Sequence, residues 1–427
     1  MNPRAFFASL DRELLVLVLA VGAVGVVNLF SASQATRPGV QYFQMGYVAV
    51  GLVVALGLAA LDTSWYERLA YPIYLVVCGL LLMVLVAGTT IKGSQRWIGF
   101  GAFNLQPSEL MKMAMVLAMA RYMARYKPGQ TLSLVDLVRP LNPSRPLALV
   151  AVLVLRFEEV AIPGSPGWST LLRVVLVIVT VLWCAVSFLR AARLGWARQV
   201  WVAPMDLMAA PAVLILVEPD LGTTLIVLAI AGTIVLFVGV RARSLGVMAV
   251  AGVAGAVVAW FKVLKEYQKQ RVLTFLNPEA DALGAGYHAN QSMIAIGSGG
   301  VQGKGFMEGT QTQLSFLPEN HTDFAFSVLA EEWGLFGAMV LLVLFALLLV
   351  KGIRIAAGAH DRFSALLAIG VAGVVFWQML VNVGMVTGLM PVVGVTLPLV
   401  SYGGSSVLTV MLGVGVWLSV ARRKPSY

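Results

Sequence analysis

A polar and acidic segment, residues 317–334 (LPENHTDFAFSVLAEEWG), runs directly into a long apolar stretch. It carries four side chains that could transfer protons or pair with cations: His321, Asp323, Glu331 and Glu332. The basic side chains of the segment before it include Lys269, Arg271 and Lys304. A carboxylate with basic neighbours can act as a general base when the leaving group is an anionic phosphate, because the acid accepts the proton and the cations stabilise the departing charge. The pattern therefore predicts a proton-transfer site near Asp323.

The same acids also have simpler structural roles open to them. Thr322 or Asp323 could cap the helix that follows, and Glu331 and Glu332 could pair with buried bases. Capping explains only one of the acids. A site around Asp323 that includes His321 is therefore the preferred interpretation.

A second motif, QPSELMK (106–112), opens an apolar helix with Pro107 in its first turn. Glu109 and Lys112 are three residues apart, so they share one helical face and can pair. Ionisable residues at membrane depth are also candidates for function. Both interpretations stay open, a structural ion pair near the interface and a binding site.

A third motif, EPDLGTT (218–224), brings two acids to a tight proline turn between apolar segments. Asp220 is well placed to cap the following helix, which is the stronger interpretation, and it is also a candidate to bind substrate. A glycine-rich stretch, AIGSGGVQGKG (295–305), fits neither the Walker nor the GxGxxG pattern. It predicts a turn rather than a nucleotide site, although Lys304 could still offer its charge to a ligand.

The composition indicates a multi-pass membrane protein. The chain has 427 residues, of which 59% are hydrophobic and 12% charged, whereas soluble domains carry about 25% charged residues. The basic residues gather between apolar runs, as cytoplasmic loops do, so the net charge of +10 is an orientation signal rather than a sign of nucleic-acid binding. The two cysteines lie in apolar runs and suggest neither a disulfide framework nor a metal site.

The hydropathy pattern predicts an all-α, polytopic bundle with both termini in the cytoplasm. The ten expected helices lie near 13–31, 44–61, 69–88, 108–125, 202–218, 221–240, 245–263, 323–350, 363–387 and 397–420. Residues 140–199 do not fit this plan and are expected to form an inserted hydrophobic hairpin. Residues 262–322 form a large outer loop, which should be ordered and should turn repeatedly because of its Gly and Pro content.

Five segments together resemble the SEDS family (shape, elongation, division and sporulation) of bacterial membrane proteins. They are KGSQRWIGFGAFNLQPSELMK (92–112), EPDLGTTL (218–225), YQKQRVLTFLNPEADALGAGYHANQSMIAIGSGGVQGKG (267–305), TQTQLSFLPENHTDFAFSVLAEEWG (310–334) and PLVSYGGSS (398–406). The resemblance covers nearly the whole chain apart from 140–199. The form TQTQLSFLPENHTDF is most similar to the elongation branch of the family rather than to its division branch.

The resemblance implies a single membrane domain over 1–427 with a fold like that of GT-C-type glycosyltransferases. It also implies a peptidoglycan glycosyltransferase that polymerises lipid II on the outer face of the bacterial cytoplasmic membrane during cell elongation. The implied partners are a class B penicillin-binding protein and the elongation machinery. The family's proposed catalytic aspartate corresponds to Asp323, and the important Glu and Lys of its fourth helix to Glu109 and Lys112. The family usually has Gln where this chain has Glu218.

The expected reaction is an inverting sugar transfer. Asp323 would deprotonate the 4-hydroxyl of the acceptor GlcNAc, which attacks C1 of the donor MurNAc and displaces undecaprenyl pyrophosphate. The leaving group would be stabilised by four cations: Arg96, Lys112, Arg271 and Lys304. The sequence shows no all-carboxylate ligand set, so no metal ligands are assigned and a divalent cofactor is left open. The alternatives are a lipid II flippase and a non-catalytic scaffold for a penicillin-binding protein.

Overall fold

The computed structural model describes residues 3–34, 37–91, 94–100, 103–127, 129–138, 204–218, 220–262, 264, 266–277 and 285–423. The helices are α1 (Pro3–Ala8), α2 (Arg12–Ser33), α3 (Val40–Ala60), α4 (Thr63–Ala87), α5 (Pro107–Met123), α6 (Leu134–Val138), α9 (Pro204–Val217), α10 (Leu221–Val238), α11 (Ala242–Lys262), α12 (Glu266–Leu276), α13 (Ala285–Gly299), α14 (Thr310–Gln313), α15 (Ala325–Ala357), α16 (Arg362–Val386) and α17 (Gly404–Ala421). The strands are β1 (Thr89–Ile91), β2 (Ser94–Phe100) and β3 (Phe103–Leu105). The hairpin expected within 140–199 lies outside the described residues.

Within the described part of the chain, eight helices are long and apolar enough to cross a membrane: α2, α3, α4, α10, α11, α15, α16 and α17. The apolar helix α9 is shorter, and α5 is buried along almost its whole length. These ten elements correspond to the ten predicted helices. The expected fold class, a polytopic helical membrane bundle, is therefore confirmed.

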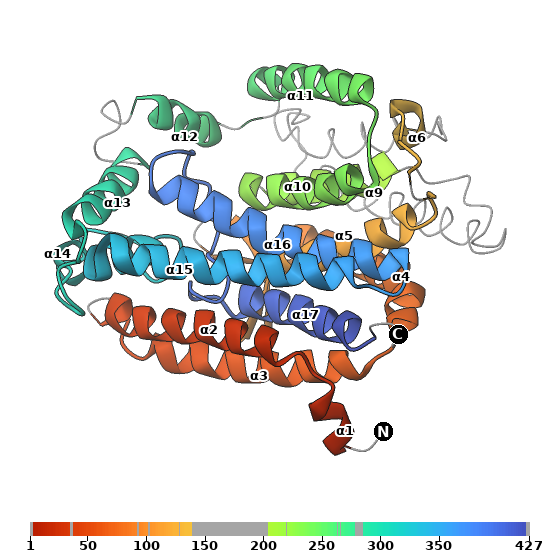
Figure 1. The fold of residues 1–427 in the computed structure, drawn as a ribbon. Coiled ribbons are helices and arrows are strands. Elements are labelled where there is room, and N and C mark those ends of the chain that lie inside the picture. The colour runs from red at the N-terminus through yellow and green to blue at the C-terminus, as the bar shows by residue number, and fades with distance from the viewer. Residues whose placement is uncertain are drawn as a thin grey trace.

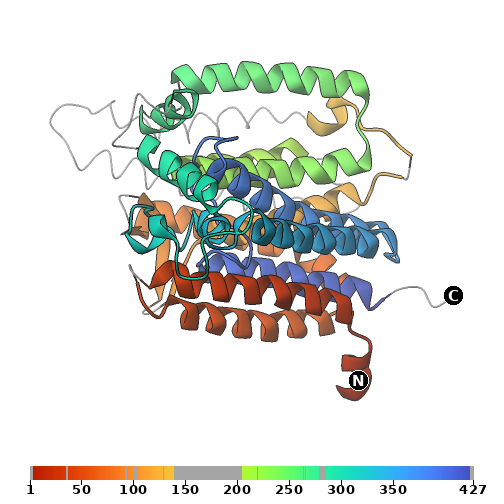
Figure 2. The same ribbon diagram turned by 60° about the vertical axis from the view of Figure 1, so that its left-hand side comes forward.

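The long helices run roughly parallel to one another, and the two ends of the bundle differ (Figure 1). Helices α12, α13 and α14 lie at one end, whereas both chain termini lie toward the other (Figure 2). Four of the long helices begin at an aspartate whose carboxylate accepts a backbone N–H of the first turn: Asp11, Asp62, Asp220 and Asp361. Such caps satisfy N–H groups that a helix start leaves without partners.

Helix α5 lies at the centre of the bundle, in contact with α4, α10, α16 and α17. Its sequence is rich in Met and Ala and has no polar face, which suits a helix that is surrounded by others. Polar side chains in the first turns of α5 therefore lie in the interior of the bundle. This placement sets the environment of Glu109 and Lys112.

The helix predicted over 397–420 is wrong in its first turns, because α17 begins only at Gly404. Leu399 has a positive φ of 62°, and the Ser401 hydroxyl oxygen accepts the Leu397 N–H at 2.9 Å. Pro398 also disfavours a helical residue before it. Residues 387–403 therefore form a non-helical connection, in which Val395, Leu397, Leu399 and Val400 are buried in the bundle.

A small antiparallel sheet, in the order β1-β2-β3, joins α4 to α5 and was not predicted. Its strands are short and separated by glycines, so the pattern resembles a loop. In the large loop 262–322, the described residues form α12, α13, α14 and a series of turns. The described residues thus turn repeatedly instead of forming one helix, as predicted.

Candidate active site

The Glu109–Lys112 pair expected from the sequence is present. Lys112 Nζ lies 2.6 Å from Glu109 Oε1, and the lysine side chain is only 1% exposed. The pair lies in the first turns of α5, inside the bundle. Separating such a buried pair leaves a charge without compensation and is costly. The ion pair is therefore confirmed, whereas its action on a ligand stays a prediction.

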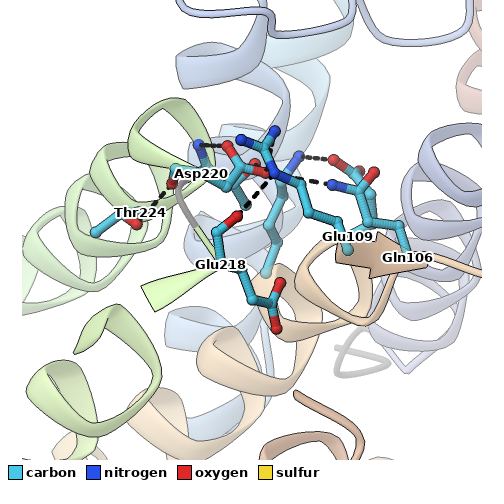
Figure 3. Close-up of polar contacts among 8 residues, drawn as sticks. Gln106, Glu109, Glu218, Asp220 and Thr224 are labelled. Carbon is cyan, nitrogen blue, oxygen red and sulfur yellow. Dashed lines mark hydrogen bonds and ion pairs between the residues drawn. The ribbon is translucent and has the colours of Figure 1, made fainter. Parts of the chain in front are cut away.

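Beside this pair, β2 and the α9–α10 turn bring Arg96 and Asp220 together. Figure 3 shows Asp220 near Gln106 and Glu109. Arg96 Nε donates to the Glu218 carbonyl oxygen at 2.9 Å, and its Nη1 lies 3.7 Å from Asp220 Oδ2. Gln106 Nε2 donates to the same Asp220 oxygen at 3.3 Å. The Asp220 carboxylate also accepts the Thr223 N–H at 3.1 Å, so the predicted helix cap is confirmed. One carboxylate thus connects the sheet, α5 and α10.

The Glu218 side chain is buried and points away from Asp220 (Figure 3). Neither of its carboxyl oxygens has a hydrogen-bond partner among the described residues. Burial raises the pKa of Glu218 to about 9; the Asp220 carboxylate adds to this shift and Arg96 opposes it. At neutral pH the group is therefore a neutral acid. The extra negative charge suggested by its difference from the family's usual Gln does not develop there.

Asp323 lies in the turn before α15, and its side chain is half-buried. Its carbonyl oxygen accepts the Asn382 amide at 2.9 Å, and the same amide donates to the Val395 carbonyl at 2.6 Å. A Cβ added at Gly394 would lie 3.4 Å from Asp323 Oδ2, and Gly394 has a φ of +74°. The connection 387–403 therefore passes directly beside the carboxylate, and only glycine suits that point.

The same connection also runs close to the Arg96–Asp220 group. Val393, the residue before Gly394, approaches the first turn of α10 so closely that a Cβ at Gly222 would lie 2.8 Å from its carbonyl oxygen. Farther along, the Ser405 hydroxyl accepts the Gln106 N–H and donates to the Asn104 carbonyl, both at 3.1 Å. Asp323 and the Arg96–Asp220 group thus lie at the same end of the bundle, on either side of one connection.

His321 and Arg271 are connected to this end of the bundle only indirectly, by way of neighbouring residues. The His321 carbonyl accepts the Tyr402 N–H at 2.9 Å, and the two rings are 6.1 Å apart. The His288 ring stacks on Phe324 with centroids 6.4 Å apart. Burial lowers the pKa of His288, with a smaller contribution from Arg271 in the same direction and an opposing one from Glu319. Arg271 therefore acts on a ring that lies beside the Asp323 turn.

Lys304 has a structural partner. Its Nζ lies 2.8 Å from Glu331 Oε1 and donates to the Thr310 hydroxyl at 2.7 Å. The fully buried Glu331 also accepts the backbone N–H groups of Gln311 and Thr312, at 2.9 and 3.3 Å. This Glu331 cluster, residues 304, 310–312 and 331, fixes the large loop 262–322 to α15. The other acid of the opening motif, Glu332, accepts a hydrogen bond from the Ser31 hydroxyl of α2.

A family model for cell cycle proteins, named for FtsW, RodA and SpoVE, matches the chain over residues 11–192 and 174–426. The chain belongs to this family. The peptidoglycan glycosyltransferase MrdB of Escherichia coli K12 is 37% identical over 422 residues, which are 98% of this chain and 96% of MrdB. The SEDS resemblance seen in the sequence is therefore confirmed, and so is the enzyme class, a glycosyltransferase.

Solved structures of the FtsW, RodA and SpoVE family agree in fold. A chain from a peptidoglycan synthase complex, in a study of how polymerization and crosslinking are coordinated, aligns with a TM-score of 0.69 and 30% identity and covers 98% of this chain and 99% of its own. The rod shape determining protein RodA of Thermus thermophilus aligns with a TM-score of 0.60 and 28% identity, covering 98% of both chains.

Sequence reasoning missed Asn382, Gly394 and Ser405, which hold the connection 387–403 in place. A signal was present for Asn382, because an amide within an apolar span needs a partner inside the bundle. Among the described residues no three His, Cys, Asp or Glu side chains are grouped as a metal site would require. The question of a divalent cofactor stays open.

Proposed function

We propose that this chain polymerises lipid II into the glycan strands of peptidoglycan, with Asp323 as the general base. The acceptor GlcNAc 4-hydroxyl gives its proton to the Asp323 carboxylate as the oxygen attacks C1 of the donor MurNAc. The C1–oxygen bond to undecaprenyl pyrophosphate breaks, and the configuration at C1 inverts. Family membership and the name of the MrdB relative support the reaction class.

The observation that carries the proposal is that a half-buried carboxylate and the Arg96–Asp220 group lie on either side of the connection 387–403. The Asp323 side chain is neither sealed in the core nor fully solvated. Gly394 leaves room beside its Oδ2 atom, and Val393 leads to the turn that holds Asp220 and Arg96. A proton acceptor and a positive charge near one another are what an anionic leaving group requires.

The four proposed cations differ in how well their surroundings suit a pyrophosphate. The Arg96 side chain is 24% exposed, so it can contact a ligand while it also contacts Asp220. Lys112 is buried with Glu109, and its contribution would be a fixed positive charge near the site. Lys304 is engaged by Glu331, which favours a structural role. Arg96 is therefore the cation that we expect to contact the leaving group.

The membrane orientation follows from the same proposal. Lipid II is polymerised on the outer face of the cytoplasmic membrane, so the end of the bundle with Asp323 and α12–α14 faces outward and both termini face the cytoplasm. The basic residues at the opposite end support this orientation. A class B penicillin-binding protein is the proposed partner and supplies the transpeptidase, which is supported by the related chain in a synthase complex.

The test is glycan synthesis by the purified chain, with and without its penicillin-binding protein, from labelled lipid II in detergent. Asp323→Asn and Asp323→Ala should reduce polymerisation by about 10²- to 10⁴-fold, because a positioned base is lost. The matched control is Asp361→Asn at the other end of the bundle, where asparagine can still cap α16. Elution as a single species in detergent would verify folding.

Near-normal polymer from both Asp323 variants would remove this residue from the reaction. Absence of polymer from the unaltered chain, even with its partner, would instead favour the scaffold or the flippase. Lipid II transfer between vesicle leaflets then separates those two alternatives.

A further inference from the structure

A groove between α2 and α15 lies at the end of the bundle opposite to Asp323. It has a volume of about 450 Å³. Its apolar lining consists of Val16, Leu17, Leu347 and Val350, and its charged lining of Arg12, Glu13, Lys351 and Arg354. The charged residues lie toward the start of α2 and the end of α15, so the groove is apolar along the helices and charged at its mouth.

The charges at the mouth do not cancel. Lys351 is neutralised by two acids, with its Nζ 2.9 Å from Asp11 Oδ2 and in contact with the Glu13 carboxylate. Arg12 and Arg354 are exposed, and neither side chain has a hydrogen bond or ion pair within the described part of the chain. Two arginines thus offer their donors to an anion at the mouth of the groove.

The apolar part of the groove is open to the surroundings of the bundle. Val16, Leu347 and Val350 are 64%, 49% and 44% exposed. Both α2 and α15 are long and apolar enough to span a membrane, so these side chains face acyl chains in a bilayer. A ligand that matches the groove must combine an anionic head with apolar chains.

We propose that this groove binds an anionic phospholipid. Its phosphate would accept hydrogen bonds from Arg12 and Arg354, and its acyl chains would lie along Val16, Leu347 and Val350. Arginine donors suit phosphate because the guanidinium fork can bind two oxygens at once. Basic pockets between membrane helices bind anionic headgroups in the same way. Free phosphate lacks the apolar chains that the lining would contact.

The expected preference for an anionic over a zwitterionic lipid follows from the positive charges of Arg12 and Arg354. A cation near an anionic lipid surface contributes about 1 kcal/mol, so loss of both arginines should weaken binding roughly 30-fold. Loss of the arginines should weaken binding of a zwitterionic lipid less, because its ammonium group already offsets the charge of its phosphate. The ratio between the two lipids is therefore the informative quantity.

The experiment measures phosphatidylglycerol and phosphatidylcholine retained by the full chain in detergent, by native mass spectrometry. The unaltered chain should prefer phosphatidylglycerol, and the double variant Arg12→Gln/Arg354→Gln should lose that preference. The matched control, Arg241→Gln/Arg243→Gln, removes two exposed charges at the start of α11 and should keep the preference. Leu347→Trp, which fills the apolar part, should reduce retention without any change in charge.

Three results would overturn the proposal. Equal retention of the two lipids by the unaltered chain would show no headgroup selectivity. Equal losses in the two arginine double variants would indicate diffuse attraction rather than a groove. Displacement of phosphatidylglycerol by inorganic phosphate alone would show that the apolar lining is not used. Each variant is compared only if it elutes as a single species.

Discussion

Burial keeps the carboxyl group of Glu218 protonated and neutral at neutral pH. Its ordinary pKa of 4.5 is raised to about 9 by burial and by the nearby Asp220 carboxylate. Between these values the folded chain keeps a proton that the unfolded chain has released. Stability therefore falls as pH rises through this window, by on the order of 3 kcal/mol at pH 7. A neutral glutamic acid also resembles glutamine in size and polarity.

We accordingly expect Glu218→Gln to retain activity at neutral pH and to be more stable than the unaltered chain at pH 9. Thermal unfolding midpoints in detergent, measured from pH 5 to 9, should fall with pH for the unaltered chain and stay flatter for the variant. Glu308→Gln makes the same change at an exposed position and should not alter the profile. Parallel profiles for Glu218→Gln and the unaltered chain would show that the acid is already ionised.

The residues differ in how far the sequence could predict their contacts. The Glu109–Lys112 pair and the Asp220 cap follow from local spacing along a helix, and both are present. The Lys304–Glu331 pair joins residues 27 positions apart in the chain, so local spacing gave no signal for it. The Asp323 environment likewise depends on the connection 387–403, whose path is set by tertiary packing.

At the scale of elements, the Glu331 cluster determines whether the large loop 262–322 stays attached to α15. Gly303 brings the loop so close to this helix that a Cβ there would lie 2.1 Å from the Glu332 carbonyl oxygen. The Glu331 carboxylate pairs with Lys304 and accepts hydrogen bonds from two backbone N–H groups of the loop. Breaking a buried pair of this kind destabilises by about 3 to 5 kcal/mol, and the 25% exposure of Lys304 places the expected loss below that range.

Glu331→Gln should therefore loosen the loop and expose the bond after Lys304 to trypsin. Cleavage at that site in the detergent-purified chain should become faster than in the unaltered chain. The control is Glu266→Gln, which breaks the more exposed pair between Glu266 and Lys269, 3.5 Å apart, and should have little effect. Unchanged cleavage after Lys304 in Glu331→Gln would mean that backbone contacts alone hold the loop.

Helix existence was more predictable than helix ends. All ten predicted helices are present, because apolar runs of membrane length leave few other structures available. The start of α17 was misplaced because residues 397–403 are as apolar as the helix that follows. They are buried as an irregular segment, and composition alone does not separate these two states.

At the scale of the whole molecule, the proposal requires the two ends of the bundle to face different compartments. Asp323 and α12–α14 lie at one end, and the termini and the proposed lipid groove lie at the other. The positively charged turns at the second end predict that it faces the cytoplasm. Cysteine labelling can test this orientation directly, since the native cysteines are only Cys78 and Cys184 and both can be replaced by alanine.

In that background, Val301→Cys reports on the Asp323 end, where Val301 is 69% exposed, and Arg243→Cys reports on the opposite end. A membrane-impermeant maleimide should label Val301→Cys in intact spheroplasts and Arg243→Cys only after lysis. Full labelling of both variants in lysed cells is the control for reactivity. The reverse pattern would put Asp323 in the cytoplasm, where it could not polymerise lipid II that is presented on the outer face, and the proposed reaction would have to be abandoned.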